Sequence, residues 1–197
     1  AKPVFDFDCM SLLQTVTSMR DQGEFLSGRA LSNPPRVFIG AAANPFAPPL
    51  DYRPLRLKKK IDAGAQFVQT QYCFDIQRLK QYMAQVHDMG LTERCYILVG
   101  VGPLASARTA AWIRDNVPGV HIPDEIIHRL LAAHNPREEG IRICVEMIQA
   151  IRAIEGVHGI HIMAYRQEER VSDIVKDSGV LEGRVPWHPG MAQRLIH

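Results

Sequence analysis

The sequence predicts an α/β fold in which parallel strands alternate with helices. Four short apolar runs of strand length are each followed by a loop and a segment with helical spacing of apolar residues. The first run is apolar on both faces, which is typical of a parallel sheet. Repeated strand–helix units imply parallel strands joined by right-handed crossovers. A closed (β/α)8 barrel needs eight such units, so two architectures stay open: a small open sheet, or the second half of a barrel.

The expected elements follow from periodicity and from the residues that begin and end helices. Strands are expected at 37–42, 66–71, 96–99 and 159–163. Asp8, Asp75 and Ser106 are suited to cap helices, and Gly64 and Gly90 to end them. Residues 124–133 and 137–155 form two helices inserted before the last strand, and 179–197 form a tail with little periodicity. The full set of expected helices is 9–20, 54–63, 76–89, 107–116, 124–133, 137–155 and 168–178.

Charge and composition exclude several classes of protein. The 197 residues contain 23 Lys and Arg against 21 Asp and Glu, a net charge of +2, and 46% are hydrophobic. The longest basic run is Lys58-Lys59-Lys60, so the chain carries no electrostatic footprint for nucleic acid or a membrane surface. Runs of about 18 apolar residues, which a membrane helix needs, are absent from the sequence. An ordinary folded globular protein is expected.

The cysteines and the start of the chain add two expectations. Cys9, Cys73, Cys95 and Cys144 form no C-x-x-C pair, which argues against a zinc site or a disulfide framework and favours a reducing compartment, the cytoplasm. The chain begins at Ala1 without a methionine, so a preceding segment is expected.

Candidate site residues stand where the predicted strands end, because parallel α/β folds place their chemistry there. Gln71 closes the second strand with an amide that can donate and accept, which suits the lactam edge of a heterocycle. The alternative, a Gln bonded to a neighbouring loop, is favoured on spacing alone. The other candidates at strand ends are Asn44, Tyr72, Gly102 and the segment 163–167.

A cationic cluster and a histidine also allow two interpretations each. Lys58, Lys59 and Lys60, with Arg53 and Arg56 on the same helix, suit either a pyrophosphate or a solvated face. Consecutive helical residues point about 100° apart, so at most two of the three lysines serve one anion. His161 lies within an apolar strand, where a core histidine bonded to backbone is favoured over a general base.

Several enzyme classes lack their signatures in this chain. The sequence contains no Ser/His/Asp set, no paired catalytic carboxylates at readable spacing and no Walker loop, so hydrolase and kinase functions have no support. The segment 100–103, GVGP, lacks the third glycine of a dinucleotide-binding fingerprint.

One long motif resembles a known family. Residues 57–75, LKKKIDAGAQFVQTQYCFD, are similar to the pattern L-K-x-K-[VI]-D-A-G-A-[DQ]-F-x-x-T-Q-x-x-F-D of methylenetetrahydrofolate reductases. Shorter matches lie in the same order at 40–45 (GAAANP), 99–104 (VGVGPL), 120–123 (VHIP) and 159–162 (GIHI). The resemblance extends from Lys2 to about Gly179.

The resemblance implies a fold, a cofactor and a reaction. Members of this family are (β/α)8 TIM barrels that bind FAD and reduce 5,10-methylenetetrahydrofolate to 5-methyltetrahydrofolate in one-carbon metabolism and methionine biosynthesis. Residues 1–178 then correspond to strands five to eight, the C-terminal half of a flavin-binding barrel. The family's catalytic Glu and Asp lie on strands one and four, so they are expected upstream of Ala1, and no catalytic acid is assigned here.

Individual residues carry over from the motifs. Gln71 matches the glutamine that contacts folate, Lys60 matches a lysine that contacts the FAD phosphates, and Lys59 stands where an arginine is common. Arg56, on the same helix as the lysines, joins the expected cofactor site. Asn44 replaces a tyrosine of the cofactor site, and Met163 and Gln167 stand where a tyrosine and an arginine lie near the folate. Pro48 falls near the place of a histidine that contacts FAD. These departures resemble a divergent subgroup that includes forms of one-carbon and corrinoid pathways.

The expected function is therefore flavin-dependent reduction of methylenetetrahydrofolate, with this chain as part of the enzyme. NADH, NADPH or another donor supplies electrons, and the missing N-terminal half or a partner chain completes the barrel. A homo-oligomer is expected. The alternative is a non-catalytic folate- or flavin-binding subunit that needs a partner chain.

Overall fold

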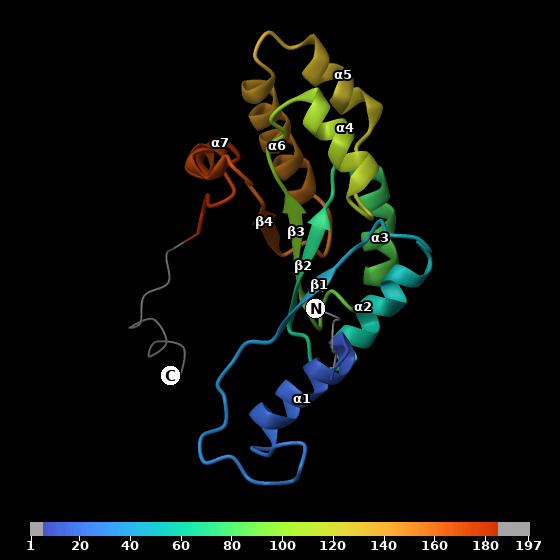
Figure 1. The fold of residues 1–197 in the computed structure, drawn as a ribbon, viewed down its shortest axis with the longest axis vertical. Helices are drawn as coiled ribbons and strands as arrows, with labels where there is room; N and C mark the ends of the chain where they lie inside the picture. The colour runs from blue at the N-terminus through green and yellow to red at the C-terminus, as the bar shows by residue number, and fades with distance from the viewer. Residues whose placement is uncertain (1–5, 185–197) are drawn as a thin grey trace.

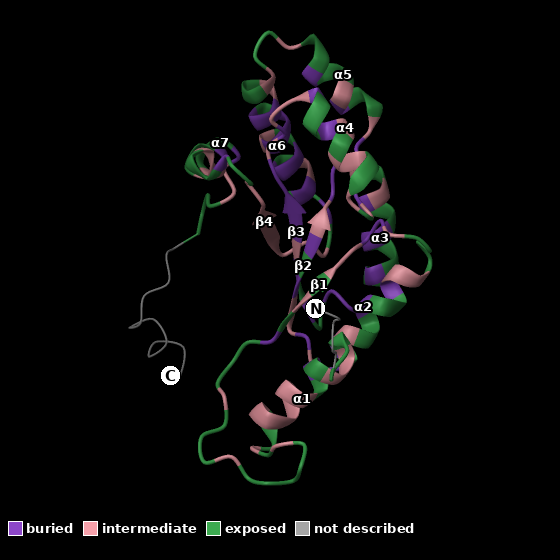
Figure 2. Ribbon diagram, viewed as in Figure 1, coloured by how far each residue is buried: buried purple, intermediate pink, exposed green. Residues whose placement is uncertain are grey.

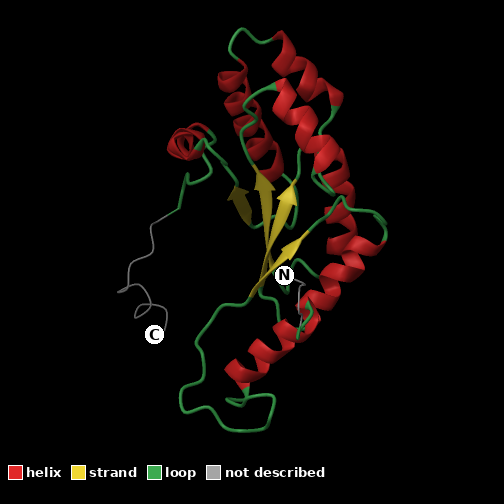
Figure 3. Cartoon of the chain, in the orientation of Figure 1, coloured by secondary structure: helices red, strands yellow, loops and turns green. Residues whose placement is uncertain are grey.

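The fold is a four-stranded parallel sheet with helices packed on one face. In the computed structural model, residues 6–184 are described, so 185–197 of the expected tail lie outside the described residues. Strands β1 (Gly40–Ala43), β2 (Phe67–Tyr72), β3 (Tyr96–Val101) and β4 (Gly159–Ile162) pair in chain order, and all three pairings are parallel. Figure 3 shows the strands side by side with helices interposed along the chain. The predicted α/β class and the parallel strands are confirmed.

The helices begin and end close to the predicted residues. Asp8, Asp75 and Ser106 accept backbone N–H bonds as N-caps, as expected. Figure 1 shows α1 and its following loop at one end of the molecule and α4 to α6 at the other. The helices are α1 (Cys9–Asp21), α2 (Tyr52–Asp62), α3 (Ile76–Asp88), α4 (Ala107–Asn116), α5 (Asp124–Ala132), α6 (Pro136–Arg152) and α7 (Val171–Asp177), with a 3-10 turn at Glu168–Arg170.

The first strand starts later than predicted. Residues 37–39 were expected to belong to it, but β1 begins at Gly40. The side-chain oxygen of Gln66 accepts the N–H of Ile39 at 3.0 Å, and the carbonyl of Ile39 accepts from both Gln66 and Phe67. The side chain of Gln66 thus accepts the hydrogen bond that Ile39 would otherwise donate to a neighbouring strand. The hydrophobic periodicity of the sequence does not reveal such a bond.

One face of the sheet is fully packed by helices. Val68 on β2 and Ile97 and Val99 on β3 are completely buried there. Against them lie Ile148 and Ile151 of α6, which are also completely buried, and Figure 2 shows buried stretches on β3 and α6. The predicted apolar strands therefore supply the main core.

The opposite face remains open among residues 6–184. Gln69 and Ala42 are exposed on it, and Tyr96 keeps 56% of its surface accessible. At the amino ends of the strands, the ring of Phe38 stacks on Phe67 at 5.5 Å and lies 6.0 Å from Tyr96. This aromatic cluster occupies one end of the open face, and polar side chains occupy the other.

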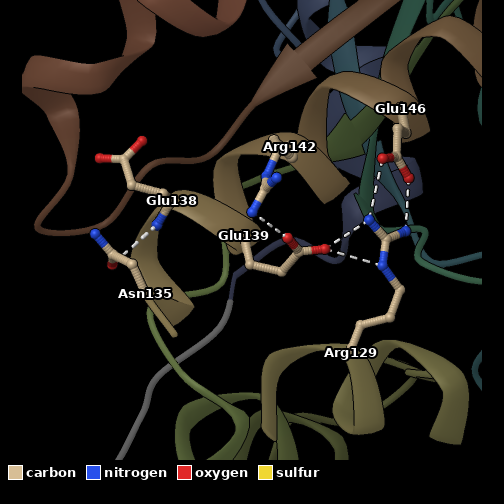
Figure 4. A network of polar contacts seen from close by, with 6 residues as sticks. All are labelled: Arg129, Asn135, Glu138, Glu139, Arg142 and Glu146. Carbon is tan, nitrogen blue, oxygen red and sulfur yellow. Dashed lines mark hydrogen bonds and ion pairs between the residues drawn. The ribbon is translucent and has the colours of Figure 1, made fainter. Parts of the chain in front are cut away.

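Ion pairs hold the inserted helices together. Figure 4 shows the guanidinium of Arg129 on α5 between Glu139 and Glu146 of α6, with nearest N–O distances of 2.6 Å to each carboxylate. Arg142 reaches the same Glu139 at 2.6 Å. Glu138, one residue earlier, pairs with Arg170 at 2.8 Å and so connects α6 to the segment after β4. The insertion thereby braces the loop that carries Met163.

Candidate functional site

A cavity of about 410 Å³ opens where the strands end. This position agrees with the general rule for parallel α/β folds. Helix α2 forms one side, and the ends of β1, β2 and β4 form the other. The lining includes Asn44, Arg56, Lys60, Gln71, His161 and Met163, so the structure brings together five of the seven predicted site residues and adds His161.

The helix side of the cavity is cationic. Arg53, Arg56 and Lys60 share one face of α2 because they are three to four residues apart. Lys60 donates to the carbonyl of Ala42, and Arg53 donates to the carbonyls of the loop after β1. Within residues 6–184, none of the three cations has a carboxylate within ion-pair distance. Arg53 and Lys60 are half-buried and Arg56 is exposed, and three clustered cations without a counter-ion suit an anionic ligand.

The pKa of Lys60 also indicates a site for an anion. Burial lowers the pKa of Lys60, and the positive charges of Arg56 and Arg53 act in the same direction, with Cys9 opposing them. An anion held between these groups would favour the charged form of the lysine and oppose this lowering of its pKa.

The three consecutive lysines make three different kinds of contact. Lys58 pairs with Asp62 at 2.5 Å on the outer face of α2. Lys59 donates to the hydroxyl of Tyr52 at 3.0 Å and does not line the cavity, so its predicted contact with the cofactor stays a prediction. Lys60 alone faces the cavity, which fits the limit that helical geometry sets on such a run.

The strand side of the cavity presents a defined amide. The side-chain oxygen of Gln71 accepts the N–H of Tyr72 at 3.0 Å. That bond fixes which end of the amide is oxygen, because the backbone N–H requires an acceptor. The NH2 group of Gln71 is then left to donate. Gln71 therefore bonds within its own strand and also lines the cavity, and its predicted contact with a heterocycle stays a prediction.

Two polar atoms at the cavity have no protein partner. Asn44 donates to the carbonyl of Pro118 at 3.0 Å, while its Oδ1 is buried without a partner among the described residues. Nδ1 of His161 is likewise buried without a partner within 6–184, so the backbone bond expected for this histidine is absent and that prediction is wrong. Both atoms are shielded by the surrounding protein, so neither faces the open space of the cavity.

Glycines allow the strand ends to approach closely. A Cβ on Gly100 would lie 2.4 Å from the carbonyl oxygen of Thr70 and 2.7 Å from the Cε of Met163. A Cβ on Gly102 would lie 2.1 Å from the carbonyl oxygen of Met163, which also accepts the hydroxyl of Tyr72 at 2.9 Å. Strand β3 therefore contributes no side chain at this level, and β2 and β4 supply the walls.

Gln167 lies apart from the cavity lining. Its side chain is 8% exposed, and its amide donates to the carbonyl of Pro103 at 3.2 Å. This bond anchors the segment after β4, in which Arg166 has a positive φ of 57°. The predicted contact of Gln167 with a substrate stays a prediction, and the structure gives this side chain an anchoring contact.

Sequence reasoning missed His161 as a lining residue. In the sheet, His161 pairs with Gly100, and Gly100 also pairs with Tyr72 of β2. The signal was the alternation along β4, which puts His161 on the face opposite that of Ile160 and Ile162. Register decides which face is open, and register follows from tertiary structure.

Comparisons with known proteins agree on the family. The family model described as methylenetetrahydrofolate reductase matches residues 9–179. A probable methylenetetrahydrofolate reductase (NADPH) of Caenorhabditis elegans is 28% identical over 161 residues, which cover 76% of this chain and 24% of the relative. The chain thus spans about a quarter of that relative's length.

A solved structure has a similar fold. It is that of an uncharacterized protein from Clostridium thermocellum, described as binding two copies of 5-methyl-5,6,7,8-tetrahydrofolic acid. The TM-score is 0.55 at 14% sequence identity, with 83% of this chain and 67% of that chain covered.

Proposed function

The chain belongs to the methylenetetrahydrofolate reductase family, and from this premise we propose that it forms part of an enzyme that reduces 5,10-methylenetetrahydrofolate to 5-methyltetrahydrofolate with FAD. The observation that carries the proposal is the cavity at the strand ends, cationic on one side and amide-lined on the other. NADH, NADPH or another donor would supply the electrons, as part of one-carbon metabolism and methionine biosynthesis.

The cationic side fits the diphosphate of FAD. Arg56 and Lys60 face the cavity without a carboxylate partner among residues 6–184, and the pKa of Lys60 is lowered by burial. Charge-assisted bonds to phosphate oxygens would satisfy both cations. Asn44 lines the same cavity, with its side-chain amide donating to the carbonyl of Pro118. When bound, FAD supplies the hydride chemistry that reduction of a methylene group requires.

The strand side fits the substrate heterocycle. Gln71 directs an NH2 donor from β2, and Met163 provides an apolar surface from the end of β4. A polarizable thioether packs well on a flat ring. Gln167 would act indirectly in this proposal, since its bond to Pro103 anchors the loop that holds Met163. The catalytic acid and base would come from chain outside these residues.

The open face of the sheet supports a half-barrel. Four strands do not close a barrel, and the aromatic cluster lies on the face without helices, while the cavity opens beside α2 at the carboxyl ends of the strands. We propose that residues 1–178 are the second half of a (β/α)8 barrel whose other half, or a partner chain, covers this face. The oligomer that we expect would form from such completed barrels.

The cysteines fit the cytoplasmic location that we propose. All four are free, and Cys73, Cys95 and Cys144 are buried. Burial raises the pKa of Cys73 to about 12, so this thiol stays protonated and unreactive. Within residues 6–184, no helix combines the length and apolarity needed to cross a bilayer.

A second candidate function is folate binding without catalysis. The structural neighbour from Clostridium thermocellum is described as binding two copies of 5-methyltetrahydrofolate, which favours this alternative. Such a subunit would keep Gln71 as a folate contact and would need no hydride transfer. The two functions differ in whether the full-length protein turns over methylenetetrahydrofolate.

The test uses the full-length protein and a matched pair of lysine variants. Lys60→Ala removes a charge-assisted bond, which is worth about 1.5–3 kcal/mol, so FAD affinity should fall roughly ten- to a hundredfold. Lys58→Ala changes an equal charge on the outer face of the same helix and should leave FAD affinity unaltered. Equal FAD affinity of both variants, or a full-length protein that neither binds FAD nor reduces methylenetetrahydrofolate, would overturn the proposal.

A further inference from the structure

We propose that Tyr72 is a positioning residue for folate binding, because its hydroxyl holds Met163 in place at the cavity. The inference rests on the proposed function, since it assigns a further residue to the same site. The observation behind it is a hydroxyl from the end of β2 that reaches past β3 to the residue after β4, where it donates to the carbonyl of Met163 at 2.9 Å.

The carbonyl of Met163 needs this donor because the sheet does not supply one. Strands β3 and β4 pair in parallel, and the N–H of Met163 donates to the carbonyl of Val101 at 2.8 Å. The next bond of such a ladder would run from the N–H of residue 103 to the carbonyl of Met163. Residue 103 is proline, which has no N–H. The hydroxyl of Tyr72 therefore takes the place of a missing backbone donor where the chain leaves the sheet.

A glycine lets the tyrosine ring reach across β3. A Cβ on Gly102 would lie 2.8 Å from Cε1 of Tyr72 and 2.1 Å from the carbonyl oxygen of Met163, so a side chain there would displace them. The ring also stacks on the buried ring of Phe74, with centroids 5.4 Å apart. Burial raises the pKa of the Tyr72 hydroxyl, so this group stays a donor at neutral pH.

The bond matters for the cavity because Met163 lines it. A Cβ on Gly100 would lie 2.7 Å from Cε of Met163, so the thioether packs over a residue that has no side chain to confine it. Methionine is flexible, and the place of its thioether then depends on where its backbone is held. A held thioether is a preformed apolar surface for a flat ring, and preorganisation raises affinity. Tyr72 thus acts through Met163 without touching the folate.

The test is a double-mutant cycle that measures binding of 5-methyltetrahydrofolate to the full-length protein with bound FAD. Tyr72→Phe removes the hydroxyl but keeps the ring and the backbone N–H that donates to Gln71, and folate affinity should fall about three- to tenfold. In a Met163→Ala background the same substitution should change folate affinity by less than about twofold, because the positioned group is gone. Tyr165→Phe, at a tyrosine that is 74% exposed, is the control and should bind folate like the original protein.

A second measurement follows Met163 itself. Hydroxyl-radical oxidation of Met163 in the absence of folate should be faster in Tyr72→Phe than in the original protein, because the end of β4 has lost a hydrogen bond. Tyr165→Phe should leave the rate unaltered. Equal oxidation of Met163 in Tyr72→Phe and in the original protein would contradict the proposal, and this result decides the question if Met163→Ala does not fold.

The outcomes separate this inference from the proposed function. If the original protein binds folate and Tyr72→Phe binds it equally well, or loses the same factor in both backgrounds, the role of Tyr72 is overturned while the proposed function stands. Equal losses of FAD and folate affinity would also overturn it, because a tyrosine that only supports the fold would give that result. If the original protein binds no folate, both proposals fall.

Discussion

The two faces of the sheet are built for different tasks. On the covered face, Val68, Ile97 and Val99 meet helices and lose all contact with water. On the open face, the sheet presents Gln69, Tyr96 and His161, which are exposed or half-buried. Successive side chains of a strand point to opposite faces, so adjacent residues can serve stability and binding separately.

This difference predicts which property, folding stability or ligand affinity, a substitution on each face should change. Removing a side chain from the covered face creates a cavity and should weaken folding without altering ligand affinity. Removing one from the carboxyl end of the open face should weaken binding at little cost in stability. A single substitution that lowered both stability and ligand affinity would contradict this separation of the two faces.

The largest effect is expected on the covered face. Ile148 of α6 is completely buried, and Ile148→Ala should lower the free energy of unfolding by about 2–5 kcal/mol through lost burial and a cavity. Chemical denaturation of the full-length protein measures this. Leu131→Ala, at a side chain that is 68% exposed on α5, should change stability by less than about 0.5 kcal/mol. FAD affinity should match the original in both variants, and a change in Ile148→Ala would contradict the separation of the faces.

A somewhat smaller effect tests whether the open face is covered in the full-length protein. If a barrel closes over it, Tyr96 becomes interior, and Tyr96→Ala should cost about 3 kcal/mol of unfolding free energy. Tyr165→Ala, at a side chain that is 74% exposed after β4, serves as the control with a cost below about 0.5 kcal/mol. If the two tyrosine variants were equally stable, the open face would stay in contact with water and the half-barrel would be wrong.

The next prediction concerns the strand side of the cavity. Gln71→Glu keeps an oxygen to accept the N–H of Tyr72 but removes the NH2 donor. The unmatched group should cost about 1–3 kcal/mol in substrate binding, so folate-dependent turnover should fall roughly five- to a hundredfold. Oxidation of the reduced nicotinamide by a quinone needs no folate and should continue. Gln77→Glu on the exposed face of α3 is the control, and a parallel loss of both activities would show that Gln71 supports the fold.

The smallest effect is a pH dependence on the helix side. Burial lowers the pKa of Lys60 from 10.5, so between the lowered value and 10.5 the unfolded chain binds more protons than the folded one. The ligand-free protein should therefore gain stability from this group as pH rises through that window, whereas FAD affinity should fall because the anion needs the ammonium form. Lys60→Arg should flatten the FAD profile, since an arginine stays charged. Lys58→Arg should leave the pH profile of FAD affinity unchanged. If FAD affinity depended on pH in the same way in both variants, Lys60 would not belong to the anion site.

Much of the fold was predictable because it depends on local chemistry. Asp8, Asp75 and Ser106 cap helices through bonds that span three residues, so the sequence pattern alone reveals them. The start of β1 was not predictable, because the N–H of Ile39 donates to the side chain of Gln66, which lies 27 positions later in the sequence. Long-range contacts of this kind leave no periodic signal.

The site was predictable in part for the same reason. The strand-end rule identified Asn44 and Gln71, and the motif resemblance identified Lys60. His161 was interpreted as a satisfied core residue, because only the pairing of β4 with β3 shows which face of the strand is open. The different directions of Lys58, Lys59 and Lys60 follow from helix geometry, but their partners could not be foreseen.

The measurement that tests the central claim most directly is oxidative footprinting of methionines in the full-length protein. Met163 lines the cavity and is half-buried, and Met19 of α1 is half-buried away from it. Adding FAD together with 5-methyltetrahydrofolate should slow hydroxyl-radical oxidation of Met163 and leave Met19 unchanged. Equal oxidation of Met163 with and without saturating ligands would contradict the claim that the open face of this sheet is where the cofactor and the folate bind.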